Sequence, residues 1–205
     1  MLHAFCCSFA VSLFDFNPDG SIPDDNPFAG DTSRQGAIWA YGLHNAYSFA
    51  FHPVGHQLVA DENGRSGSDA LDLIVRGANY GWPASGSPSR AGVNEPIAVM
   101  NPRIGPTGST FYTGDQIPEW TNDWFFCNAE QGQLRRVRLA PGSFDRIVFE
   151  EVVKQGCTYD VVTGPDGALY YSDAKGIYRI RRSGADVLPA VKMGVSPQPT
   201  PINTP

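Results

Sequence analysis

The chain has little positive charge and no long apolar run. Its 205 residues include 15 Lys and Arg against 21 Asp and Glu, a formal net charge of -6. Nucleic acid is therefore not an expected partner, because binding to phosphates requires a basic surface. No run reaches the roughly 18 apolar residues of a membrane-spanning helix. Residues 1–14 also lack a basic start and a small-residue cleavage site, so we expect neither a membrane span nor a signal peptide.

Cysteine is scarce, and the four cysteines lack the spacing of metal ligands. Cys6 and Cys7 are adjacent in the sequence. Cys127 and Cys157 stand far apart, and no C-x-x-C motif occurs. A structural zinc site is therefore not expected. Because Cys127 follows the apolar run 124–126, a buried thiol is the favoured interpretation, and a disulfide with Cys157 is the alternative.

A sustained helical pattern is also missing from the chain. No segment keeps its apolar residues at the period of an α-helix, which argues against long helices. Glycine (22 residues) and proline (17 residues) are frequent instead, and with Asn and Asp they close a series of short apolar runs. Short runs bounded by turn residues predict β-strands. The expected strands span residues 37–41, 48–52, 57–61, 71–75, 97–100, 109–112, 123–128, 133–139, 146–152, 159–163, 168–172 and 176–181.

The expected strands form three groups of four that share one layout. A strand, a Pro/Gly turn, a second strand and an acidic end follow one another in 51–61 and again in 163–173, and 112–128 repeats this order with a longer turn. A repeat of ~40 residues with four strands is typical of a propeller blade. We therefore predict an all-β fold of three four-stranded antiparallel blades, with breaks near Arg90 and Pro141. A β-sandwich is the alternative.

Two segments carry a family resemblance. The first is 41–51, with the sequence YGLHNAYSFAF, and the second is 64–83, which ends in NYGWP. Both resemble motifs of the soluble pyrroloquinoline-quinone-dependent sugar dehydrogenases, the glucose/sorbosone dehydrogenase family. The resemblance implies a six-bladed β-propeller, of which this chain matches about the C-terminal half. It places the partial propeller at 13–183, leaves 1–12 unassigned, and makes 184–205 a Pro-rich extended or disordered tail.

The resemblance also implies a reaction. Family members hold pyrroloquinoline quinone in a funnel at one end of the propeller, where a calcium ion polarises it for hydride transfer from a sugar. A histidine takes the proton of the sugar hydroxyl. That histidine belongs to the N-terminal half of the family, so no residue of this chain is expected to be catalytic.

Five positions match cofactor-binding motifs of the family. Asn45 matches an asparagine, but the arginine that precedes it in the family is His44 here. Gly64 matches a glycine whose carbonyl faces calcium in the family. Its partner there is usually a proline and is Arg65 here, but a backbone carbonyl survives this change, so Gly64 and Arg65 are the expected metal ligands. Asp69 matches an acidic residue of the same loop, with a turn cap as its alternative role. We expect this loop to lie at the funnel end, beside His44 and Asn45.

Three further positions lack the positive charge that the family sets against the anionic quinone. Where the resemblance implies a lysine and two arginines, this chain has Glu130, Cys157 and Tyr159. At ~4 Å and an effective dielectric of ~20, the reversed charge of Glu130 opposes binding by several kcal/mol. The sequence therefore predicts that the cofactor geometry of the family is not retained.

These residues leave open more than one function. The first interpretation is an oxidoreductase that oxidises aldose sugars with pyrroloquinoline quinone and calcium, here truncated and inactive alone. The alternative is a non-catalytic propeller that binds a carbohydrate or a protein, and a calcium-dependent lactonase or esterase is a third. The resemblance further implies a periplasmic or extracellular location, a sugar as the small-molecule partner, and another chain that supplies the missing blades.

Overall fold

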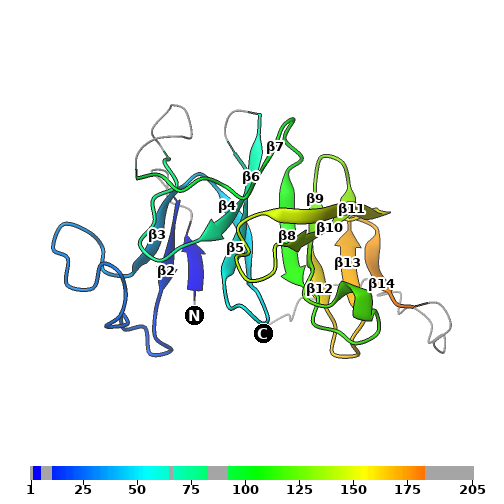
Figure 1. The fold of residues 1–205 in the computed structure, drawn as a ribbon, viewed down its shortest axis with the longest axis horizontal. Coiled ribbons are helices and arrows are strands. Elements are labelled where there is room, and N and C mark those ends of the chain that lie inside the picture. Colours follow the sequence, from blue (N-terminus) through cyan, green and yellow to red (C-terminus); the bar gives the residue numbers. More distant parts are fainter. Residues whose placement is uncertain (1, 6–10, 65–66, 83–91, 183–205) are drawn as a thin grey trace, which may run out of the picture.

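The computed structural model describes residues 2–5, 11–64, 67–82 and 92–182, with only the backbone described for 2–5 and 11. Within these ranges the chain consists of strands and one short 3₁₀ turn, Pro118–Trp120. The strands form four antiparallel sheets that follow one another along the longest axis of the molecule (Figure 1). The predicted all-β fold of propeller blades is confirmed.

Each sheet is a meander of strands in sequence order. The first sheet contains β1 (Leu2–Phe5), β2 (Val11–Asp15) and β3 (Ile38–Leu43). The second contains β4 (Ala46–Phe51), β5 (Leu58–Glu62), β6 (Asp69–Ile74) and β7 (Ala98–Met100). The third contains β8 (Pro106–Phe111), β9 (Trp124–Asn128), β10 (Gln133–Leu139) and β11 (Ile147–Gln155). The fourth contains β12 (Val161–Thr163), β13 (Leu169–Asp173) and β14 (Gly176–Ile180).

All twelve expected strands are present, but their predicted grouping is wrong by one strand. The predicted break near Arg90, which itself lies outside the described residues, falls between β6 and β7, and these two strands pair in one sheet. The predicted break at Pro141 falls between β10 and β11, which also pair. The sheets change instead at 44–45, 101–105 and 156–160. A Pro/Gly turn has the same local signal inside a hairpin as between two sheets, so the turns alone did not distinguish them.

The core lies between the sheets, and β9 contributes to two interfaces at once. Trp124 and Phe126 pack in the cluster between the second and third sheets. Phe125 and Cys127 pack in the cluster between the third and fourth sheets. All four side chains are fully buried. Because successive side chains of a strand point to opposite faces, this single apolar run holds three sheets together.

Two further boundaries expected from the sequence lie near the ends of the chain, at residues 12 and 184. β1 lies within the segment 1–12 that carried no assignment, and its backbone pairs with β2. The proposed tail 184–205 lies outside the described residues. Among the residues that the structure describes, no helix is long and apolar enough to cross a bilayer.

Candidate functional site

Loops at one end of the sheets bring most of the predicted site residues together. Strand pairing defines this end: the start of β4 lies against the end of β5, the start of β8 against the end of β9, and the start of β10 against the end of β11. We call this end the rim. It comprises the loop segments 44–45, 63–64, 103–105, 129–132 and 156–160.

Hydrogen bonds tie the rim segments to one another across the second, third and fourth sheets. The backbone N–H of Asn63 donates to the Asn45 carbonyl at 2.9 Å, and its side-chain amide donates to the Pro106 carbonyl at 2.9 Å. At the next boundary, Thr107 Oγ1 donates to the Thr158 carbonyl at 3.2 Å. The rim is therefore one continuous polar edge. Asn63 ties the second sheet to the third.

His44 lies on this edge beside the loop that follows β5, as expected. Its backbone N–H donates to Glu62 Oε1 at 2.9 Å, and its ring Nδ1 lies 2.6 Å from the Asn63 carbonyl oxygen. The ring also packs edge-on against Trp82, with ring centres 4.5 Å apart. The Nδ1 hydrogen bond and the aromatic contact therefore fix the orientation of the imidazole, while the backbone bond to Glu62 anchors the residue.

Asp69 is a structural anchor of the rim. Its carboxylate accepts the N–H of Gly64 at 3.0 Å and the N–H groups of Ile104 and Gly105 at 2.7 Å each. The first bond closes the loop, and the other two join it to the start of the third sheet. Arg65, the second expected calcium ligand, lies outside the described residues. The geometry gives Asp69 a loop-closing role that its match to the family motif did not indicate.

Glu130 does not face the rim as an isolated negative charge. Arg103 Nε lies 2.7 Å from Glu130 Oε1, and both side chains are well exposed. Arg103 reaches this position because the backbone N–H of Glu130 donates to the Ile104 carbonyl at 3.1 Å, which brings the two loops side by side. The two residues belong to different loops, so no local sequence signal joined them.

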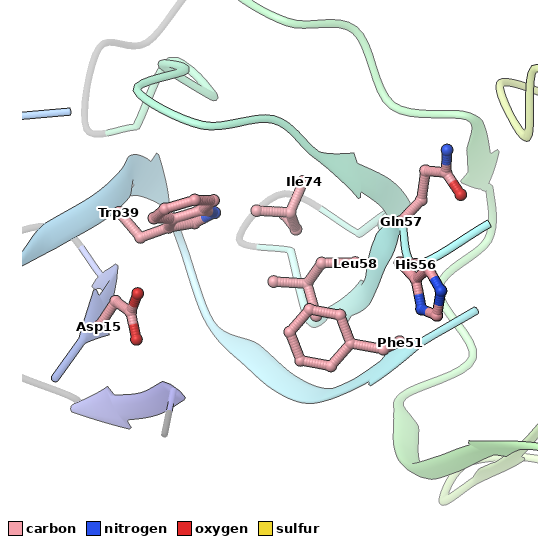
Figure 2. Close-up of a pocket in the computed structure, with 7 residues that line it drawn as sticks. All are labelled: Asp15, Trp39, Phe51, His56, Gln57, Leu58 and Ile74. Atoms are coloured by element: carbon pink, nitrogen blue, oxygen red, sulfur yellow. The ribbon is translucent and has the colours of Figure 1, made fainter. Parts of the chain in front are cut away.

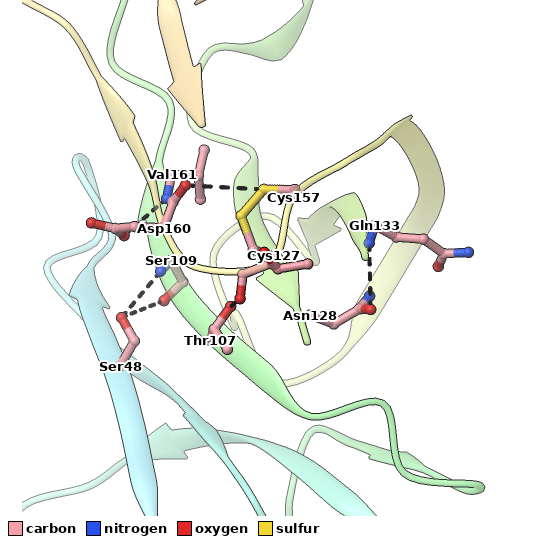
Figure 3. Close-up of a disulfide and its surroundings, with 10 residues drawn as sticks. Ser48, Thr107, Ser109, Cys127, Asn128, Gln133, Cys157, Asp160 and Val161 are labelled. Carbon is pink, nitrogen blue, oxygen red and sulfur yellow. Dashed lines mark hydrogen bonds between the residues drawn. A yellow bond between two sulfur atoms is a disulfide. The ribbon is translucent and has the colours of Figure 1, made fainter. Parts of the chain in front are cut away.

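Cys157 is bonded to Cys127, and the favoured interpretation of a buried thiol is wrong. The disulfide joins the end region of β9 to the loop before β12, with the two Cα atoms 5.0 Å apart (Figure 3). It therefore links the third sheet to the fourth at the rim. The apolar run before Cys127 correctly predicted burial, but burial does not distinguish a thiol from a bridge whose partner comes from the next sheet.

Tyr159 lies two residues after Cys157 and is 55% exposed. Its backbone belongs to the boundary between sheets: the Tyr159 carbonyl accepts the N–H of Gly108 at 2.8 Å. A Cβ atom at Gly108 would stand 1.9 Å from Asp160 Oδ1, so only glycine allows this close approach. The phenol of Tyr159 is thus offered to solvent at the edge of the rim while its backbone holds the fourth sheet in place.

A serine pair and a buried carboxyl group lie just inside the rim. The backbone N–H and the hydroxyl of Ser109 donate to Ser48 Oγ at 3.1 and 3.0 Å, joining β8 to β4 (Figure 3). The Ser48 N–H donates to Asp61 Oδ1 at 3.0 Å, whereas Asp61 Oδ2 is buried with no partner. Burial raises the pKa of Asp61 well above its usual range. The carboxyl is therefore favoured in its neutral form.

A pair of neighbouring carboxyl groups, the buried Asp72 and the half-buried Glu62, lies beneath His44. Asp72 is 3% exposed, and burial together with the adjacent Glu62 raises its pKa well above the usual range. Burial also raises the pKa of Glu62. Two close carboxyl groups in a dry site favour a state in which they share a proton. The sequence did not predict that either carboxyl group lies under the rim.

The described rim residues do not fit an anionic quinone held by charge neutralisation. Cys157 is committed to a disulfide, Tyr159 carries no positive charge, and Glu130 is paired with Arg103. Among the described residues, no group of three or more His, Cys, Asp or Glu side chains could hold a metal ion. Of the two expected carbonyl ligands for calcium, only Gly64 is described. The rim as it stands is a polar surface with few available cations.

A cavity of about 430 Å³ lies at the opposite end of the sheets. Trp39 of the first sheet faces Leu58 and Ile74 of the second across it, and Phe51 and His56 stand at one side (Figure 2). None of the predicted site residues lines this cavity. The candidate site and this cavity are therefore separate features of the molecule.

Most of the chain is similar to proteins of one known family. Residues 12–180 match the family model described as Glucose / Sorbosone dehydrogenase. An uncharacterized protein of Synechocystis sp. is 34% identical over 172 residues, covering 77% of this chain and 41% of that protein. Aldose sugar dehydrogenase YliI of Escherichia coli is 30% identical over 181 residues, covering 77% of this chain and 46% of that protein. This chain thus spans about half the length of these curated relatives.

A solved structure shows the same fold. The PQQ-bound form of aldose sugar dehydrogenase from Streptomyces coelicolor superimposes with a TM-score of 0.65 at 24% identity. The match covers 83% of this chain and 51% of that chain. The strand arrangement described above is therefore the arrangement of a known propeller.

Proposed function

This chain belongs to the glucose/sorbosone dehydrogenase family, and on that premise we propose that its rim binds a sugar but that the chain alone does not oxidise aldoses. The family consists of oxidoreductases of the sugar dehydrogenase type. The observation that carries the proposal is the charge at residues 130, 157 and 159, the three positions where the family resemblance implies cations, which we call the clamp positions. Glu130 is paired with Arg103, Cys157 is bridged to Cys127 and Tyr159 carries no positive charge, so none of the three positions supplies a cation for the carboxylates of a quinone.

Sugar binding is supported by the chemistry that the rim exposes. A sugar presents hydroxyl groups that both donate and accept hydrogen bonds, and its ring faces pack on aromatic side chains. The rim offers the half-buried imidazole of His44, the amide of Asn45 and the exposed phenol of Tyr159. Its backbone is held rigid by the bonds between sheets, so little order has to be created on binding.

Pyrroloquinoline quinone and calcium are the cofactors that the family implies. When bound, the quinone supplies a two-electron acceptor for the sugar's hydride. In this chain the residues at the clamp positions supply no positive charge for that binding, and the proposal therefore assigns the rim a ligand-binding role. The non-catalytic carbohydrate-binding propeller is the form of the function that the described residues favour.

A dye-linked oxidation assay tests the proposal directly. The chain is supplied with calcium, pyrroloquinoline quinone, D-glucose and an artificial electron acceptor, and we expect a rate equal to the blank. A doubly substituted variant, Glu130→Lys with Tyr159→Arg, restores two cations and should bind the quinone more tightly than the wild type, as measured by absorbance titration. Quinone-dependent turnover by the unmodified chain would refute the proposal, as would equal quinone affinity in the two proteins.

Location and partners form a further part of the proposal. A periplasmic or extracellular location is supported by the disulfide, because such bonds persist in oxidising compartments. A second chain that adds blades is supported by the length of the relatives, of which this chain spans 41% and 46%.

A further inference from the structure

The hydrogen bonds around His44 determine which ring nitrogen carries the proton. Nδ1 lies 2.6 Å from the Asn63 carbonyl oxygen. A carbonyl oxygen can only accept a hydrogen bond, so Nδ1 must be the protonated, donating nitrogen. In the neutral imidazole, Nε2 therefore carries the lone pair and acts as an acceptor.

Nε2 has no hydrogen-bond partner among the residues that the structure describes, and His44 is only half-buried. The ring is held edge-on against Trp82, and its backbone is held by Glu62 Oε1, so the acceptor cannot easily turn away. The result is a fixed acceptor at the rim, next to Asn45 and Asn63.

We propose that His44 is a ligand-recognition residue whose Nε2 accepts a hydrogen bond from a hydroxyl group of the bound sugar. This inference rests on the sugar binding proposed above and names the group that recognises the ligand. The two other histidines whose side chains the structure describes do not serve this role. His52 is buried, with Nδ1 accepting the N–H groups of Val54 and Gly55, and His56 lies at the opposite end of the sheets beside the cavity.

Two substitutions at His44 separate the roles of its nitrogens. In His44→Asn the side-chain amide stands close to the position of Nδ1 and can still donate to Asn63, but the acceptor at Nε2 is gone. In His44→Gln the longer side chain can place an amide oxygen near the position of Nε2 and so restore an acceptor. His56→Asn is the matched control, because asparagine tolerates the positive φ of 59° at that position.

D-glucose is the probe, and its affinity is measured by isothermal titration for all four proteins. We expect His44→Asn to weaken binding by about 2- to 12-fold, the range of one neutral hydrogen bond. His44→Gln should recover most of that loss, and His56→Asn should bind as the wild type does. In parallel, ¹⁵N NMR of the wild type should show an Nδ1-protonated ring whose Nε2 resonance shifts when glucose is added.

The outcomes distinguish this inference from the proposed function. If the wild type binds glucose but His44→Asn binds equally well and Nε2 does not shift, the inference is wrong while sugar binding stands. If His56→Asn is the variant that loses affinity, the sugar occupies the Trp39 cavity and the inference is also wrong. If the wild type binds no sugar at all, both the proposed function and the inference are overturned.

Discussion

Replacing Asp69 by asparagine should destabilise the folded chain even when no ligand is present. Asp69 is 2% exposed, and its two carboxylate oxygens accept three backbone N–H groups. Those donors come from Gly64, Ile104 and Gly105, so the side chain closes its own loop and joins the second sheet to the third. A residue that served only to hold a cofactor would leave the ligand-free stability unchanged.

The size of the effect follows from the number and kind of bonds. Hydrogen bonds to a charged group contribute ~1.5–3 kcal/mol each, and neutral ones ~0.5–1.5 kcal/mol. Asparagine keeps one acceptor oxygen, which in the least costly orientation faces Ile104 and Gly105. The Gly64 N–H then meets an amide donor, one bond is lost, and the other two become neutral. We expect the free energy of unfolding to fall by about 3.5–6 kcal/mol, a melting temperature lower by roughly 7–24 °C for a chain of this size.

Urea unfolding followed by tryptophan fluorescence measures this change. Asp19→Asn is the matched control, because Asp19 is exposed and accepts only the N–H and hydroxyl of Ser21 in a surface turn. We expect its unfolding midpoint to stay close to that of the wild type. If Asp69→Asn unfolds at the same urea concentration as this control, the carboxylate does not hold the rim together and the structural reasoning is wrong.

Two further predictions concern the disulfide and a buried histidine. Replacing both Cys127 and Cys157 by serine removes a bridge between residues 30 apart, which should lower the free energy of unfolding by about 3.5 kcal/mol in the chain-entropy model. Dithiothreitol should lower the urea midpoint of the wild type but not of this variant, and equal midpoints without reductant would contradict the bridge. Burial lowers the pKa of His52. Below about pH 6.5 the unfolded chain therefore binds more protons than the folded chain, and the free energy of unfolding should decrease as the pH is lowered. In His52→Asn the side-chain oxygen can accept in place of Nδ1. Between about pH 7.5 and 5.5 the unfolding free energy of this variant should decline less steeply than that of the wild type. Parallel curves for the two proteins would show that His52 does not cause the pH dependence.

Local pattern was sufficient to find the strands but not the sheets. The alternation within 133–139 and the turn residues on both sides predicted β10 with its exact ends, and the other eleven expected strands were found within three residues. The division into sheets was missed because Pro141 lies in a hairpin turn that resembles a boundary. Which strands pair depends on contacts between chain segments, and turn composition does not carry that information.

In the candidate site, too, the sequence predicted what lies within a local motif and missed contacts between separate loops. The sequence placed His44, Asn45 and Gly64 in one region because they lie in segments that resemble one family, and the structure brings them to one edge. It could not show that Glu130 is paired with Arg103, because that ion pair joins two separate loops.

By itself, the sequence determined the strand-forming runs, the family and the departures from its charged positions, since each of these is written in residues near one another along the chain. Only the tertiary structure decided which strands share a sheet, that Cys157 is bridged to Cys127, and which nitrogen of His44 carries the proton. The physical reason is common to all three. Strand pairing, a disulfide and a hydrogen bond each require two groups within a few ångströms, and folding alone brings such groups together from distant parts of the chain.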